Sequence, residues 1–179
     1  LAIDLFLPRD GETLPRAMTR AFHGLMEEYG LIVCEPDWIR GLLSSEMGRI
    51  VSSARPALVD ALREGEKELA ALGLPTAIPI GEATEGDPGD AAALVYHHVR
   101  AAEKLPPERI GLRAGGEGFR MDGMPGSRSH AELGSQIVST PKEWSAGALV
   151  RPLVQDAVFP TCAYVGGYGE LGYHAQLGP

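Results

Sequence analysis

The spacing of apolar positions predicts alternating helices and short strands along the chain. Apolar residues at helix spacing follow Thr13, with Pro15 in the first turn, and Gly30 ends the pattern. The apolar run of residues 31–34 follows at once and predicts a buried strand. A helix joined to a strand by so short a connection is typical of a layered α/β domain.

A second helical pattern begins near Ser44 and closes at Gly73. Its apolar residues fall on one side: Met47, Ile50, Val51, Ala54, Leu58, Leu62, Leu69 and Leu72. Pro56 lacks the amide hydrogen that a helix interior requires, so we expect a kink or a split near Arg55. Residues 76–80 then form a candidate strand.

The middle of the chain carries strong turn signals. Residues 81–92 predict a flexible loop, because they combine glycine and proline with charged residues that are all acidic. After a candidate strand at residues 93–96, residues 110–121 predict a hairpin with its turn at Gly115 and Gly116. Ser129 and Glu132 have the spacing of a capping box, which predicts the start of a short helix that ends near Val138.

The last third predicts a helix over residues 145–158 that is broken at Phe159 and Pro160. A strand over residues 162–165 runs into a glycine loop, after which a helix begins at Glu170. The loop consists of Gly166, Gly167, Tyr168 and Gly169. Glycines let a ligand approach the backbone, and a helix start presents unpaired N–H groups and a positive dipole end. The loop therefore favours a phosphate or a carboxylate.

Residues 167–172 also match the dinucleotide pattern G-x-G-x-x-G. That interpretation needs a further strand and an acidic residue about 20 positions on, where the sequence has ended. In addition, the carboxylate of Glu170 would repel a pyrophosphate. A nicotinamide or flavin site and a tight turn that binds nothing both stay open as alternatives.

Polar residues flank the glycine loop on both sides. Arg151 and Gln155 share one face of the preceding helix, and Asp156 follows them. Glu170 and His174 form an i, i+4 pair, which predicts either a surface hydrogen bond or an acid/base pair at the mouth of a cleft. With no third ligand in view, we predict no metal site.

Composition excludes several classes of protein. The 179 residues carry a formal net charge of −8, which argues against a nucleic-acid partner. The longest uncharged run near the end is interrupted by Pro160 and is too short to span a membrane. Cys34 and Cys162 lie in apolar runs and are expected to be buried thiols in a reducing cytoplasm. The abrupt ends of the sequence suggest a fragment of a larger protein.

The run from Ala148 to Pro179 resembles the bacillithiol biosynthesis cysteine-adding enzymes, the BshC family. The resemblance rests on R-P-x-x-Q-D, a proline break and G-G-x-G-E. The matching residues are Arg151, Pro152, Gln155, Asp156, Pro160, Tyr164, Gly166, Gly167, Gly169, Glu170 and Tyr173. Weaker similarity extends to LMEEYGLIVCEPD and ALREGEKELAALGL. The chain departs from the family at Tyr168, Gly172 and His174.

The resemblance implies an α/β fold with a Rossmann-like layered core, a mainly parallel sheet, flanking helices and one hairpin, in a single domain over residues 1–179. It implies a cytoplasmic ligase that adds cysteine to glucosaminyl malate, with a nucleotide such as ATP or ADP as cosubstrate and no covalently bound cofactor. The catalytic residues would be Glu170 and Asp156. The substrate-binding residues would be Arg151, Gln155, Gly166, Gly167, Gly169 and Tyr173.

The resemblance also implies a homodimer, formed through a coiled coil that lies outside this sequence. Two other functions stay open. The chain could be a non-catalytic domain that binds a small molecule or a partner, or a fragment of a dinucleotide-binding oxidoreductase. Fold alone does not decide among them.

Overall fold

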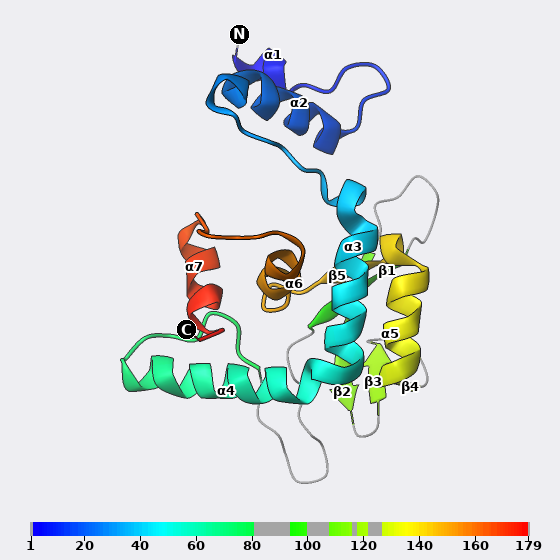
Figure 1. Ribbon diagram of the computed structural model, residues 1–179, viewed down its shortest axis with the longest axis vertical. Helices are drawn as coiled ribbons and strands as arrows, with labels where there is room; N and C mark the ends of the chain where they lie inside the picture. Colours follow the sequence, from blue (N-terminus) through cyan, green and yellow to red (C-terminus); the bar gives the residue numbers. More distant parts are fainter. Residues whose placement is uncertain (1, 81–93, 100–107, 116–117, 122–126, 179) are drawn as a thin grey trace. The chain divides into compact units, whose positions relative to one another are not determined.

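The computed structural model describes residues 2–80, 94–99, 108–115, 118–121 and 127–178 (Figure 1). The chain divides within helix α3 into two compact units, residues 1–40 (unit 1) and residues 41–179 (unit 2). The predicted acidic loop at residues 81–92 lies outside the described residues. None of the described helices is long and apolar enough to cross a bilayer.

Unit 1 is built mainly from helices. They are α1 (Ala2–Phe6), α2 (Leu14–Met26), the 3-10 turn η1 (Glu27–Tyr29) and the beginning of α3 (Pro36–Arg49). The predicted helix and its end are confirmed, since Gly30 adopts the left-handed conformation at φ 74°. Phe6 packs edge-on against Phe22, with ring centroids 5.8 Å apart, and this contact joins α1 to α2.

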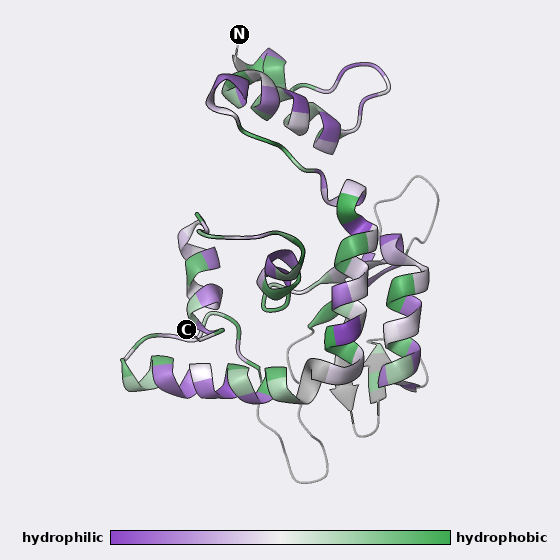
Figure 2. Ribbon diagram, viewed as in Figure 1, coloured by the Kyte–Doolittle hydropathy of each residue, from purple (hydrophilic) through white to green (hydrophobic). Residues whose placement is uncertain are grey.

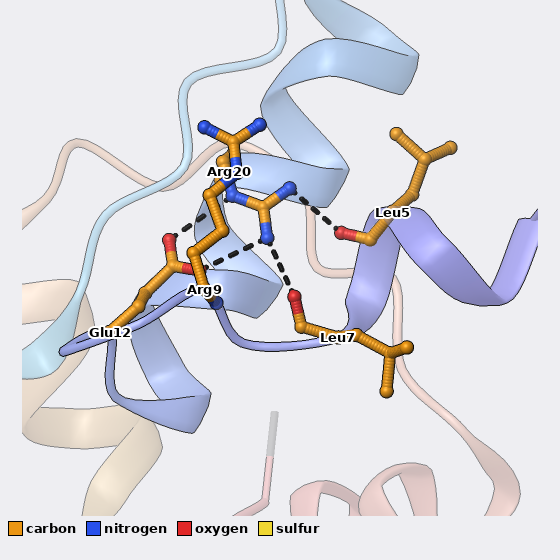
Figure 3. Close-up of polar contacts among 5 residues, drawn as sticks. All are labelled: Leu5, Leu7, Arg9, Glu12 and Arg20. Carbon is orange, nitrogen blue, oxygen red and sulfur yellow. Dashed lines mark hydrogen bonds and ion pairs between the residues drawn. The ribbon is translucent and has the colours of Figure 1, made fainter.

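Arg20 ties the loop between α1 and α2 to the helix (Figure 3). Its Nε and Nη2 donate to the two carboxylate oxygens of Glu12 at 3.1 and 3.0 Å. Its guanidinium also donates to the carbonyl oxygens of Leu5 and Leu7 at 3.0 and 2.9 Å. The hydrogen bonds from Arg20 and from the amide of Arg9 lower the pKa of Glu12 from 4.5 to about 2.

This lowered pKa predicts an acid-sensitive unit 1. Glu12 stabilises the folded state above pH 4.5, and that stabilisation is lost as the pH falls toward about 2. We expect Glu12→Gln to remove this part of the pH dependence and to lower stability at neutral pH. Denaturant titrations followed by the amide signals of α2 measure it, with Glu28→Gln, an exposed carboxylate of η1, as the control. Equal pH profiles for wild type and Glu12→Gln would contradict the assignment.

The predicted strand at residues 31–34 is wrong. The segment is irregular and coloured as hydrophobic between α2 and α3 (Figure 2). Leu31 and Ile32 are 42 % and 88 % exposed, and the thiol of Cys34 is exposed rather than buried. A strand needs a neighbour to pair its N–H and C=O groups, and none of the described strands pairs with this segment.

In unit 2, α3 continues through a π-helical turn, η2 (Ile50–Ala54), into α4 (Arg55–Ala71). The break that we predicted near Arg55 is confirmed, and Gly73 ends the region at φ 71°. The helix begins at Pro36 rather than near Ser44, because proline at the first helical position is compatible with a helix start. Helices α3 and α5 (His130–Ser139) lie side by side over the sheet (Figure 1).

Unit 2 contains a five-stranded sheet in the order β4-β3-β2-β1-β5. The strands are β1 (Val95–Val99), β2 (Glu108–Gly115), β3 (Gly118–Met121), β4 (Ser127–Ser129) and β5 (Trp144–Ala146). All four strand pairs are antiparallel. The predicted hairpin is confirmed by the pairing of Leu112 with Met121 and of Gly115 with Gly118.

The prediction of a mainly parallel sheet is therefore wrong. Strands β1 to β4 follow one another directly along the chain, and such consecutive strands pair antiparallel, whereas parallel pairing needs a long crossover. The two further segments expected to supply parallel strands, residues 76–80 and 162–165, are irregular. In the first of them the amides of Ile78 and Ile80 bind side chains, those of Gln176 and Glu66, instead of another strand.

The remaining elements complete the frame of the glycine loop. The capping box at Ser129 and Glu132 is confirmed at the start of α5. The 3-10 turn η3 (Pro141–Glu143) and β5 follow, so α6 (Arg151–Val158) begins later than the predicted residue 145. Helix α7 (Tyr168–Ala175) begins two residues before the predicted Glu170. The core of the unit lies between the sheet and these helices; its fully buried members include Leu62, Leu133, Ile137, Trp144 and Val150.

Candidate functional site

The glycine loop joins α6 to α7 on the surface of unit 2. Helix α6 ends at Val158, so the predicted break at Phe159 and Pro160 is confirmed. The strand predicted over residues 162–165 is wrong, since Val165 is 98 % exposed and Cys162 is exposed as well. Without a neighbouring strand, this connection is held by contacts from its side chains instead.

The carboxylate of Glu170 accepts hydrogen bonds from the glycine loop and from both helices. Its Oε2 accepts a hydrogen bond from the amide of Gly167 at 3.1 Å. Its Oε1 accepts from Arg151 Nη2 at 3.0 Å and from the hydroxyl of Tyr173 at 3.3 Å. Because Gly167 is the N-cap of α7 and Glu170 is at position N3, the first of these bonds is the reverse half of a capping box.

Arg151 and Tyr173 join the first turn of α6 to α7. Arg151 Nη2 donates to the hydroxyl of Tyr173, and the guanidinium lies 5.7 Å from the centre of its ring. Tyr173 is buried, whereas the side chains of Arg151 and Glu170 are 45 % and 39 % exposed. The ion pair is therefore held on its buried side by the phenol of Tyr173, and its other side is open to solvent.

Tyr164, in the connection between α6 and α7, also contacts these side chains. Its ring stacks on the imidazole of His174, with centroids 4.2 Å apart and planes inclined by 26°. Partial desolvation and a hydrogen bond with Glu170 raise the pKa of Tyr164. Together, Arg151, Tyr164, Gly167, Glu170 and Tyr173 are called the Glu170 cluster below.

Gly166 is required by this packing. A Cβ at position 166 would lie 2.6 Å from Cε1 of Tyr164 and 3.1 Å from Cβ of Glu170. At Gly167 and Gly169, by contrast, a Cβ would meet nothing within 4 Å, so both backbones face open space. The amides of Tyr168 and Gly169, in the first turn of α7, make no hydrogen bond to the described residues.

The surroundings of Glu170 favour its ionised form. The amide of Gly167, then Tyr164 and the positive charge of Arg151 lower its pKa, outweighing the opposing effect of desolvation. A carboxylate that stays ionised can hold a cation or position the loop, but it does not donate a proton at neutral pH. The geometry thus suits Glu170 to binding and positioning.

The structure brings together five of the predicted site residues: Arg151, Gly166, Gly167, Glu170 and Tyr173. Gln155 and Asp156 lie on α6, half-buried and exposed respectively, and neither side chain bonds to the Glu170 cluster within the described residues. Their roles stay predictions. Across the described ranges, no group of three or more His, Cys, Asp or Glu side chains could hold a metal ion.

Sequence reasoning missed the stacking of Tyr164 on His174. The i, i+4 spacing suggested that His174 pairs with Glu170, but its imidazole lies against the two aromatic rings of Tyr164 and Tyr173. Its Nε2 is buried and has no hydrogen-bond partner in the described part of the chain. The signal in the sequence that could have pointed to Tyr164 was its place among the residues that resemble the BshC family.

Comparison with known proteins extends over nearly the whole chain. Residues 7–179 match the family described as "Bacillithiol biosynthesis BshC, N-terminal Rossmann-like domain". A protein of Heliobacterium modesticaldum named "Putative cysteine ligase BshC" is 28 % identical over 159 residues, which cover 86 % of this chain and 26 % of the relative. A protein of the same name from Koribacter versatilis is 25 % identical over 171 residues, 94 % of this chain and 29 % of the relative.

A shorter stretch is more similar. The protein of the same name from Salinibacter ruber is 42 % identical over 60 residues, 34 % of this chain and 11 % of the relative. The chain spans less than a third of the length of each of these three relatives.

Proposed function

The chain belongs to the BshC family, in its N-terminal Rossmann-like domain, and on that premise we propose that it is part of a ligase that adds cysteine to glucosaminyl malate. The relatives named as cysteine ligases support the cysteine substrate. The Glu170 cluster is the observation that carries the proposal for this chain. It joins a carboxylate with a lowered pKa, an exposed guanidinium and a glycine loop at one surface.

The reaction forms a C–N bond between a carboxyl carbon and an amine. One carboxylate oxygen must leave and the amine must lose its extra proton, so the carboxylate has to be activated first. A nucleotide such as ATP or ADP would supply that activation by taking the oxygen on a phosphoryl group. The Glu170 cluster itself does not suit that nucleotide, because the carboxylate of Glu170 would repel its phosphates.

Within this proposal the cluster binds the substrate that carries the amine. The carboxylate of Glu170 holds the ammonium, and Arg151 pairs with a carboxylate, so that the substrate replaces the resident ion pair. Tyr173 fixes both side chains through its hydroxyl. Gly166, Gly167 and Gly169 let the substrate approach the backbone, and Gln155 lies one turn from Arg151 on the same helix. Asp156 is the candidate that accepts the proton.

Two features of the proposal extend beyond the described residues. The reaction takes place in the cytoplasm, and the active protein is a homodimer whose contacts lie outside this chain. A domain that binds the same small molecules without catalysis is the second candidate. The exposure of Asp156, with no bond to the cluster, favours that alternative.

A thermal-shift panel on the purified chain tests the substrate class. We expect glucosaminyl malate to raise the melting temperature of the wild type, because it stabilises only the folded state. The variant Arg151→Gln should lose that rise, whereas Arg49→Gln, which removes an exposed guanidinium of α3, should keep it. Stabilisation by NAD alone would overturn the proposal in favour of a dinucleotide site.

A further inference from the structure

A serine and a histidine are hydrogen-bonded to one another on the sheet of unit 2. Ser145 Oγ lies 2.7 Å from Nε2 of His98. Ser145 belongs to β5 and His98 to β1, two strands that are neighbours in the sheet. In the tautomer that carries its proton on Nδ1, the imidazole accepts the hydrogen bond of the hydroxyl. The two side chains then have the contact that a nucleophile makes with its general base.

The strand register explains why these side chains meet. Side chains alternate between the two faces of a sheet, so Tyr96 and His98 share one face of β1. Ser145 of β5 pairs with Tyr96, and Arg109 of β2 pairs with His98 on the other side of β1. All four residues therefore belong to the same face of the sheet. Ser145 and His98 are diagonal neighbours there, which is within reach of a long side chain.

The guanidinium of Arg109 places a positive charge beside the hydroxyl. Its Nη2 lies 3.5 Å from Ser145 Oγ, and its Cζ lies 4.3 Å from the centre of the Tyr96 ring. A guanidinium is attracted to the electron-rich face of an aromatic ring, so Tyr96 holds Arg109 near the hydroxyl. A positive charge at this position stabilises the oxyanion that forms when an oxygen nucleophile attacks a carbonyl group.

The bonding of Ser145 differs from that of exposed serines elsewhere in unit 2. Ser53 and Ser139 donate to carbonyl oxygens one turn earlier in the chain, those of Arg49 and Gln136. A carbonyl oxygen does not take up a proton at neutral pH, whereas a neutral imidazole does. Ser145 and its histidine are half-buried, and the neighbouring Arg109 is exposed. The hydroxyl is therefore the one of these three with a proton acceptor suited to catalysis.

We propose that Ser145 is the nucleophile, and His98 the general base, of a site that hydrolyses carboxylic esters. Ser145 Oγ bonds to the carbonyl carbon while its proton moves to His98 Nε2, and the oxyanion is stabilised by Arg109. The ester C–O bond breaks, the alcohol leaves with the proton from His98, and an acyl-serine remains. Water, deprotonated by His98, then attacks the acyl carbon. The acid leaves as Ser145 regains the proton.

This site shares no residue with the Glu170 cluster and does not depend on the ligase proposal. A fluorophosphonate probe tests the nucleophile directly in the full 179-residue chain. The hydroxyl displaces fluoride from phosphorus, so a P–O bond forms, the P–F bond breaks and the hydroxyl proton passes to His98. Mass spectrometry of the digested chain locates the adduct. We expect the adduct at Ser145, with Ser53 and Ser139 unlabelled as internal controls.

Variants separate the roles of the three side chains. Ser145→Ala should abolish the labelling and the hydrolysis of p-nitrophenyl acetate. His98→Gln should slow the labelling about a hundredfold, because a positioned general base typically contributes a factor of roughly 10²–10⁴. Arg109→Gln should slow it as well, through the lost positive charge. The matched control Ser53→Ala should leave both rates unchanged, and melting temperatures establish that each variant is folded.

Three results would overturn the inference. The first is an adduct that is absent from Ser145 or equally abundant at Ser53 and Ser139, which the wild-type chain alone decides. The second is labelling of His98→Gln at the wild-type rate, since the hydrogen bond would then be purely structural. The third is hydrolysis of p-nitrophenyl acetate by Ser145→Ala at the wild-type rate. None of these depends on ligase activity, so either proposal can fail while the other is confirmed.

Discussion

We expect Trp144→Ala to lower the free energy of unfolding by about 4 kcal/mol, the usual cost of removing a fully buried tryptophan. The Trp144 side chain is 1 % exposed and packs against the ring of His97, with ring centroids 4.3 Å apart and planes inclined by 32°. Its indole N–H bonds to Thr140, which would lose that partner. Because small domains are stable by only about 5–15 kcal/mol, the variant should be close to unfolding at 37 °C.

Chemical denaturation followed by circular dichroism measures this loss. The matched control is Trp38→Ala, which removes the same side chain from an exposed position and should cost less than about 0.5 kcal/mol. A similar loss in the two variants would show that Trp144 is not the centre of the core. The packing described for the sheet and α5 would then be wrong.

The second large effect is expected from Gln176→Leu, at about 2–3 kcal/mol. Gln176 is fully buried at the end of α7. Its side chain donates to the carbonyl oxygen of Ile78 at 2.8 Å and to Glu66 at 3.4 Å, and it accepts from the amide of Ile78 at 3.3 Å. It thereby ties residues 74–80, which run from α4 toward α7 (Figure 1), to both helices. Leucine keeps the volume and leaves the peptide groups of Ile78 without partners.

Hydrogen exchange locates this effect. The amide of Ile78 loses its hydrogen-bond acceptor, so in Gln176→Leu its exchange should accelerate by a larger factor than that of the β1 amides, which report the loss of global stability. Gln155→Leu is the control, because Gln155 is half-buried on α6 and its side chain makes no hydrogen bond to the described residues. An unchanged exchange rate at Ile78 would mean that the segment is held in some other way.

Local signals in the sequence were sufficient for the parts of the fold that depend on neighbouring residues. Gly30 and Gly73 end helices in the left-handed conformation, as expected. The capping box of Ser129 and Glu132 is present, and the hairpin of residues 110–121 pairs as predicted. Each of these features is determined within a few residues, so pattern and chemistry agree.

Predictions that depended on distant partners failed. Residues 31–34 and 162–165 have strand composition, but an apolar run becomes a strand only when another strand accepts its hydrogen bonds. Residues 76–80 instead bond to Gln176, almost one hundred positions away in the chain. The direction of pairing in the sheet likewise followed from connection lengths that apolar patterns do not reveal.

The candidate site likewise has features that the sequence predicted and features that it did not. The motif brought Arg151, Glu170 and Tyr173 into one prediction, and the structure places their side chains in contact. The motif did not reveal that the loop's own amide lowers the pKa of Glu170, which favours a binding role over the acid/base pair with His174 that was left open.

An amide NMR titration with glucosaminyl malate tests directly whether the Glu170 cluster is a small-molecule site. We predict progressive shifts of the amide signals of residues 166–170, with little change in β2 and β3. Glu170→Gln should weaken the binding about tenfold, since a charged contact is lost. Signals of residues 166–170 that stay unmoved at millimolar glucosaminyl malate, or shifts that are as large in Glu170→Gln, would contradict the claim.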